Sequence, residues 1–173
     1  MKHAFTLARA ADADELVELM REFYAFEHIA FDEGAARCAL RQILSDGKLG
    51  VIYLIRAGAR ESEGAQAEKE AEEKEAGVTA ETAAETAGYL VITFGFSLEF
   101  HGRDAFVDEL FLRESFRGQG IGQACVEFAA EVCRGEGIAA LHLEVERANA
   151  RAQALYRRSG FSDHDRYLLT KWL

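Results

Sequence analysis

The stretch LFLRESFRGQGIGQACVEF, residues 110–128, restricts the possible folds more than any other part of this sequence. An apolar run is followed by glycines at positions 118, 120 and 122, and an amphipathic pattern begins directly after them. This order predicts a strand, a tight turn and a helix. Such a turn exposes backbone N–H groups at the positive end of the helix dipole, where an anion can bind.

The two common nucleotide-binding loops do not fit this turn. The dinucleotide-binding fingerprint requires a glycine three residues after Gly120, where this chain has Gln123, and the NTPase loop requires a lysine that does not follow here. A phosphate or pyrophosphate is the natural ligand of the free N–H groups, and Arg117 can add a charge contact. A tight turn without any ligand is the alternative.

Hydrophobic patterns divide the rest of the chain into alternating strands and helices. The spacing of Asp12 and Glu15 predicts a capping box at the start of the first helix. The patterns together predict an α/β fold, in which a mixed, mostly antiparallel central sheet has helices on both faces. The predicted strands are 3–10, 49–58, 88–100, 104–112, 139–145 and 166–173, and the predicted helices are 12–27, 33–45, 121–134 and 149–160.

We expect one domain, residues 1–173, with an acidic insertion rich in alanine and glutamate at about residues 58–87. Residues 58–88 hold nine glutamates against three basic residues, which is −6 of the formal net charge of −10. This segment has almost no large apolar side chain, so it predicts a solvated insertion between two strands. The negative charge argues against nucleic acid as a partner and is weak evidence for a cationic substrate.

The sequence predicts a cytoplasmic chain with no membrane partner and no metal. No apolar run has the length of a membrane span, and the first residues lack the apolar core of a signal peptide. The cysteines at 38, 125 and 133 are odd in number and lack metal-ligand spacing. Cys125 and Cys133 lie on the apolar stripe of the predicted helix, so we expect them to be buried.

Two motifs resemble those of the GNAT superfamily of N-acetyltransferases. FRGQGIGQACVEFA resembles its acyl-CoA-binding signature, and LEVERANARAQALYRRSGF, residues 143–161, resembles its second motif. The order of elements agrees over almost the whole chain, and only the acidic insertion departs from it. VDELFL, which precedes the glycines, also resembles the diamine and polyamine acetyltransferase branch.

This resemblance implies an acetyl-CoA site. The strand before the glycines would splay from the next parallel strand in a V, and the backbone of Phe111 and Leu112 would pair with the pantetheine arm. The superfamily also uses Asn149 near the cofactor, while Arg158 would either contact its phosphates or solvate the helix. The N–H groups that would hold the pyrophosphate are those of Gly118, Gln119, Gly120, Ile121 and Gly122.

The resemblance also implies direct transfer to an amine, without an acyl-enzyme. It places Tyr156 beside the departing sulfur as the acid, and the alternative is a core aromatic residue. Asp108 and Glu109 lie in an otherwise apolar strand, where carboxylates are costly unless paired, wetted or used. Alternation along a strand predicts that the two face opposite ways, with one of them serving as the base. An ion pair with an arginine is the alternative.

Two functions follow from this sequence. The first is an acetyl-CoA-dependent N-acetyltransferase that acts on a primary amine, expected to be a small cationic one such as a polyamine. The second is a non-catalytic acyl-CoA-binding or sensing module. A homodimer formed through the C-terminal strand is compatible with either function.

Overall fold

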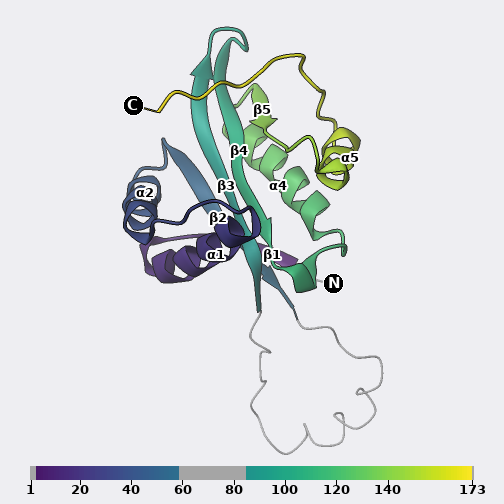
Figure 1. Ribbon diagram of the computed structural model, residues 1–173. Coiled ribbons are helices and arrows are strands. Elements are labelled where there is room, and N and C mark those ends of the chain that lie inside the picture. Colours follow the sequence, from purple (N-terminus) through teal and green to yellow (C-terminus); the bar gives the residue numbers. More distant parts are fainter. Residues whose placement is uncertain (1–2, 59–84, 173) are drawn as a thin grey trace, which may run out of the picture.

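A computed structural model describes residues 3–58 and 85–172. In this part of the chain five strands form one sheet in the order β1-β2-β3-β4-β5 (Figure 1). The first four pair antiparallel and β4 pairs parallel with β5, so the predicted mixed, mostly antiparallel sheet is confirmed. The strands are β1 (His3–Leu7), β2 (Gly50–Ala57), β3 (Glu85–Ser97), β4 (Gly102–Leu112) and β5 (Ala140–Leu143).

Helices cover both faces of the sheet, as predicted (Figure 1). α1 (Ala13–Phe26) and α2 (Glu33–Ser45) pack on one face, and α4 (Ile121–Gly135) packs on the other beside α5 (Ala150–Arg158). The alternation of side chains along β3 supplies both cores. Tyr89 and Val91 pack with α1 and α2, whereas Leu90 and Ile92 pack with α4.

The helix predicted after the glycines has the expected bounds and the expected apolar stripe. α4 begins at Ile121 and ends at Gly135, and Cys125 and Cys133 on its inner face are buried. No helix in the described parts of the chain is long and apolar enough to cross a membrane.

The predicted capping box at the first helix is wrong. Asp12 accepts a hydrogen bond from the backbone N–H of Arg9 at 2.7 Å, because a short 3-10 turn precedes α1 and brings that N–H to its carboxylate. Glu15 instead forms an ion pair with Arg56 of β2 at 2.7 Å. Glu15 therefore contacts Arg56, which is distant in sequence, and not the start of its own helix.

The predicted final strand, 166–173, is also wrong over its described residues. Residues 166–172 are irregular, and their large apolar side chains are exposed. Arg166 pairs with Glu99 at 2.8 Å, and the guanidinium of Arg147 lies over the ring of Tyr167, 5.6 Å from its centroid. These contacts carry the segment past the ends of β3 and β4, where it joins no strand (Figure 1).

Most of the predicted acidic insertion, residues 59–84, lies outside the described residues. Its last three positions do not belong to an insertion. β3 begins at Glu85, and Thr86 and Ala87 are buried in the sheet. Their small side chains lack the apolar bulk that usually reveals a buried strand in a sequence.

Candidate active site

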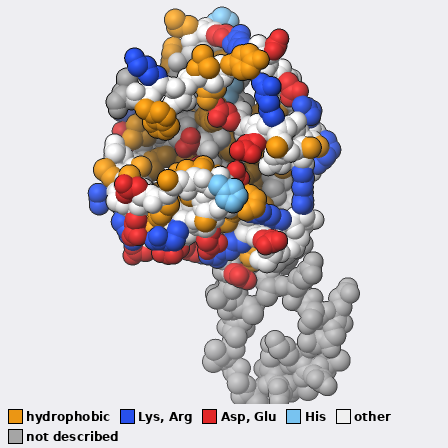
Figure 2. All heavy atoms as spheres, viewed as in Figure 1, with side chains coloured by type: hydrophobic (Ala, Val, Ile, Leu, Met, Phe, Trp, Pro, Cys, Tyr) orange, Lys and Arg blue, Asp and Glu red, His pale blue; other side chains and the backbone are white. Residues whose placement is uncertain are grey.

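A cavity of about 1010 Å³ lies beside β4. Its walls come from α1, β4, α5 and the segments that follow β5 and α5, and Figure 2 shows acidic side chains in and around the hollow on this face. Pairing between β4 and β5 ends at Val107 and Leu143, whereas β4 continues to Leu112. Among the described residues, no strand therefore pairs with this side of β4 over residues 108–112.

A β-bulge in β4 changes the expected orientation of the two carboxylates. Val91 pairs with Glu109 and the next residue, Ile92, pairs with Val107, so Asp108 is the extra residue. A bulge breaks the alternation of side chains at this point. Asp108 and Glu109 both line the cavity, and the charge of Asp108 contributes to raising the pKa of Glu109. The prediction that they face opposite ways is therefore wrong.

Glu109 is held by two tyrosine hydroxyls. Tyr24 of α1 donates to Oε1 at 2.8 Å and Tyr89 of β3 donates to Oε2 at 2.6 Å. Burial raises the pKa of Glu109, and these two hydrogen bonds act in the opposite direction. Neither Glu109 nor Asp108 forms an ion pair with an arginine among the residues that the structure describes.

Tyr156 and Asn149 reach the same cavity from α5. Burial raises the pKa of the Tyr156 phenol, so the hydroxyl stays protonated at neutral pH and can act as a donor. Its ring meets Phe161 edge-on at 6.0 Å. Asn149 caps α5 as its sequence position indicates, since its side chain accepts from the N–H of Ala152 at 3.0 Å.

The glycine turn opens the N-terminus of α4. Gly118 and Gly120 have φ values of 78° and 83°, a region that favours glycine. Gly120 is the N-cap of α4, and no side chain in the described structure caps this end. The first N–H groups of the helix have no partner within it.

The arginine whose side chain extends toward the glycine turn is neither Arg117 nor Arg158. The Nε of Arg117 donates to the Leu112 carbonyl at 2.7 Å and its guanidinium lies 4.0 Å from the Phe26 ring centroid, so it braces the turn against α1. Arg158 is exposed and does not line the cavity. Arg151 instead extends toward Gly118, with Nη2 3.1 Å from where a Cβ on that glycine would lie.

Arg151, Tyr24 and Tyr89 are therefore site residues that sequence reasoning missed. Arg151 lies within the second motif, two residues after Asn149, and its place in the first turn of α5 was the available signal. Tyr24 gave no signal of this kind, because it lies 85 residues from the carboxylate it contacts.

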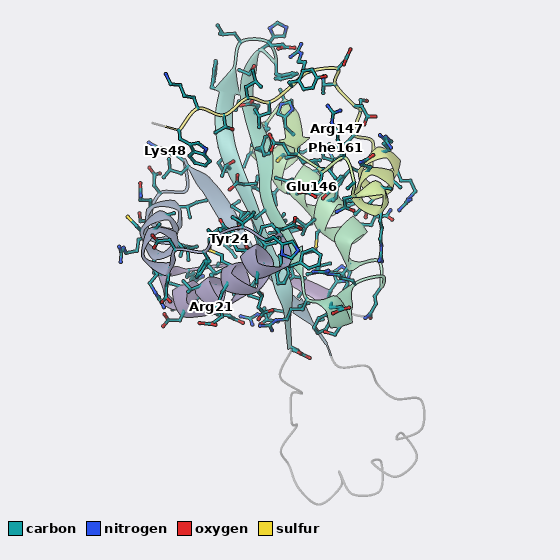
Figure 3. The ribbon with its side chains drawn as sticks, viewed as in Figure 1. Arg21, Tyr24, Lys48, Glu146, Arg147 and Phe161 are labelled. Carbon is teal, nitrogen blue, oxygen red and sulfur yellow. The ribbon has the colours of Figure 1, made fainter. Side chains whose placement is uncertain are left out.

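Charge is divided around the cavity. One part of the lining is negative, and its carboxylates are Glu27 directly after α1, Asp108 and Glu109 of β4, and Glu144 after β5. Basic groups come from the segments nearer the C-terminus, and Figure 3 labels Arg147 and its sequence neighbour Glu146 in the segment that leads to α5. An edge of β4 that no described strand pairs with, a protonated phenol and two carboxylates thus border one space.

This chain is similar in sequence to known acetyltransferases. The model of the acetyltransferase (GNAT) family matches residues 39–161. The thialysine N-epsilon-acetyltransferase of Bos taurus is 34% identical over 76 residues, 44% of this chain and 44% of that protein, so the match spans less than half of that relative. The streptothricin acetyltransferase of Streptomyces lavendulae is 26% identical over 160 residues, 92% of this chain and 82% of that protein.

Solved structures share the fold of this chain. An integron cassette protein from the mobile metagenome of Cole Harbour Salt Marsh has a TM-score of 0.75 and 31% identity, covering 98% of this chain and 90% of that one. A predicted acetyltransferase from Clostridium acetobutylicum, solved with acetyl-CoA, has a TM-score of 0.70 at 14% identity over 98% of this chain and 96% of that one. The second likeness shows the fold alone.

Proposed function

Because the chain belongs to the acetyltransferase (GNAT) family, we propose that it transfers an acetyl group from acetyl-CoA directly to the amine of a small cationic molecule. The observation that carries this proposal is the meeting of Tyr156 with Asp108 and Glu109 at one cavity, beside the unpaired edge of β4. An acid on one element can protonate the departing sulfur while a base on another element takes the proton from the amine nitrogen.

The residues present fit acetyl-CoA. Beyond Val107 the edge of β4 is free to pair with the amides of the pantetheine arm through Phe111 and Leu112, and the V-shaped opening of the superfamily would lie between this edge and β5. The Leu112 carbonyl also accepts a hydrogen bond from Arg117, so its second lone pair would serve the pantetheine. Asn149 borders the same space.

The pyrophosphate would bind at the glycine turn. Its ligands would be the N–H groups from Gly118 to Gly122, which include those of Gln119 and Ile121, at the uncapped N-terminus of α4. Arg151 supports this role, because its guanidinium lies over Gly118 and would add a positive charge. Arg158, by comparison, would serve only to solvate α5.

In the proposed acetyl transfer, every proton that moves has a donor and an acceptor. The substrate ammonium gives one proton to a carboxylate of the Asp108–Glu109 pair, and the free amine attacks the thioester carbonyl, forming a C–N bond. The C–S bond then breaks, and Tyr156 donates a proton to the sulfur. The nitrogen loses its second proton, which restores the phenol through solvent, so the overall reaction releases one proton with free CoA and the amide.

The acceptor is proposed to be cationic because the lining near the carboxylates is acidic. Glu27 and Glu144 lie around the same cavity as Asp108 and Glu109, so a second positive charge on the acceptor would also find a carboxylate. The name of the bovine relative specifies acetylation at an ε-nitrogen, so an amine is the acceptor group of that protein too.

We also propose a homodimer. Leu169 is 88% exposed and Trp172 is 90% exposed, in a segment that pairs with no strand in the described structure. Large apolar side chains that gather on a surface in this way commonly mark a protein interface.

Replacing Tyr156 by phenylalanine tests the proposed function. Release of free CoA from acetyl-CoA, measured with a panel of diamines, should fall by about 10²–10⁴-fold, because the thiolate loses its proton donor. Thermal stabilisation by acetyl-CoA should stay as in the wild type. Tyr53→Phe is the control, since Tyr53 lies on β2 and packs against Phe128.

Two results would contradict the proposal. Unchanged turnover in Tyr156→Phe would remove the assigned acid. Failure of the wild type to release CoA with any amine, despite clear stabilisation by acetyl-CoA, would favour a non-catalytic acyl-CoA-binding module instead.

A further inference from the structure

The two neighbouring carboxylates of β4 have very different surroundings. Both oxygens of Glu109 accept a hydrogen bond, one from Tyr24 and one from Tyr89. Asp108 protrudes at the bulge, is exposed to the cavity, and accepts no hydrogen bond from any residue that the structure describes. Adjacent groups that differ in this way are suited to different tasks.

The two tyrosines are fixed by packing. The Tyr24 ring meets Phe23 at 5.7 Å and Phe31 at 5.6 Å, both edge-on. Tyr89 is 1% exposed and its ring lies 6.2 Å from that of Phe111. The hydroxyls therefore reach Glu109 from two rigid elements, and burial beside its charge raises the pKa of both phenols, which keeps them protonated donors.

We propose that Tyr24 and Tyr89 are positioning residues that hold Glu109 as a fixed anion for the substrate ammonium, and that Asp108 takes the proton from that ammonium. This inference rests on the proposed function and deepens it. Both oxygens of Glu109 already accept a hydrogen bond from a phenol, so a proton from the substrate has less access to Glu109 than to Asp108. No residue in the described parts of the chain donates to Asp108, so its lone pairs are available to the substrate.

Other charged groups face Glu109 across the cavity. Burial raises the pKa of Glu109, the hydroxyls of Tyr89 and Tyr24 act against this, and the charge of Asp108 raises the pKa further. The other groups around the cavity are Glu27 directly after α1, Tyr156 and Arg157 of α5, and Glu144 and Glu146 in the segment after β5. The substrate ammonium would thus approach a surface that is negative near β4. It would lose its proton to Asp108 while the neighbouring Glu109 carboxylate is held in place by the two tyrosines.

Titration of Glu109 tests the role of the tyrosines without any acceptor amine. In protein labelled with ¹³C at the glutamate carboxyl carbons, the signal of Glu109 is identified by its loss in Glu109→Gln. Its midpoint should rise by about one to two pH units in Tyr24→Phe, because one hydrogen bond to the charged form is lost. Tyr53→Phe should leave it unchanged, and an unchanged midpoint in both Tyr24→Phe and Tyr89→Phe would overturn the positioning role.

The division of labour between the carboxylates is tested by kinetics. Asp108→Asn should lower kcat by about a hundredfold or more and abolish the acidic limb of its pH profile. Glu109→Gln should keep that limb and chiefly raise KM for the amine. The reverse pattern, with the limb lost in Glu109→Gln and kept in Asp108→Asn, would overturn the assignment.

Failure of this inference can be told apart from failure of the proposed function. Absence of turnover with every amine would refute the proposed function and the proton-acceptor role of Asp108 together. The Glu109 midpoint would then still decide whether the tyrosines hold the carboxylate, because that measurement requires no acceptor.

Discussion

Gly118 is the residue at which an unusual backbone conformation and the proposed cofactor site coincide. Its φ of 78° is strained for any residue with a Cβ, and that Cβ would lie 3.1 Å from Nη2 of Arg151. Gly118→Ala should therefore reshape the turn and displace the arginine. We expect KM for acetyl-CoA to rise about tenfold, which corresponds to the 1–2 kcal/mol that a left-handed residue costs.

Gly135→Ala is a matched control for this substitution. A Cβ at Gly135 would meet nothing within 4 Å, and the residue closes α4 without a positive φ. KM for acetyl-CoA should stay as in the wild type there. Equal KM values in the two variants would show that the turn does not hold the cofactor.

At the scale of single residues, the sequence predicted which side chains line the cavity better than it predicted how they are oriented. Tyr156, Asn149 and the two strand carboxylates all line the cavity, as the motifs indicated. The relative orientation of Asp108 and Glu109 could not be predicted, because a bulge depends on the register with β3. The contact of Tyr24 with Glu109 depends on how α1 lies across the sheet, which no local pattern encodes.

At the scale of elements, the C-terminal segment carries a prediction about assembly. If Leu169 and Trp172 pack against a second copy, replacing both by glutamate should convert a dimer into a monomer, because the charges would have to be buried. Light scattering after size-exclusion chromatography measures the mass directly. A wild-type chain with the mass of a monomer would refute the proposed dimer.

Helices and strands with strong periodic patterns were predictable to within a few residues. α2 has the bounds of the prediction, 33–45, since Asp32 caps it and accepts from the N–H of Ala35 at 3.0 Å. The C-terminal strand failed for a different reason. Alternating apolar residues show a tendency toward strand, but a strand forms only where an edge receives it, and Arg166 holds this segment to Glu99 instead.

At the scale of the whole molecule, the architecture followed from the order of the elements, whereas the electrostatics did not follow from the net charge. Of the −10 carried by the chain, −6 lies in residues 58–88, most of which is outside the described structure. The acidic character that matters for an amine is local, in the carboxylates around the cavity. Composition could not distinguish these two contributions, because it does not record where the charges gather.

The most direct test of the account compares two acceptors that differ only in their distal group. With acetyl-CoA as donor, kcat/KM for 1,4-diaminobutane should exceed that for 4-aminobutanoate by about tenfold or more, because the distal ammonium meets carboxylates where the distal carboxylate is repelled. Mass spectrometry of the acetylated product confirms the transfer in each case. An equal or reversed preference, or the absence of any acetylated amine, would contradict the claim that this cavity receives a cationic amine.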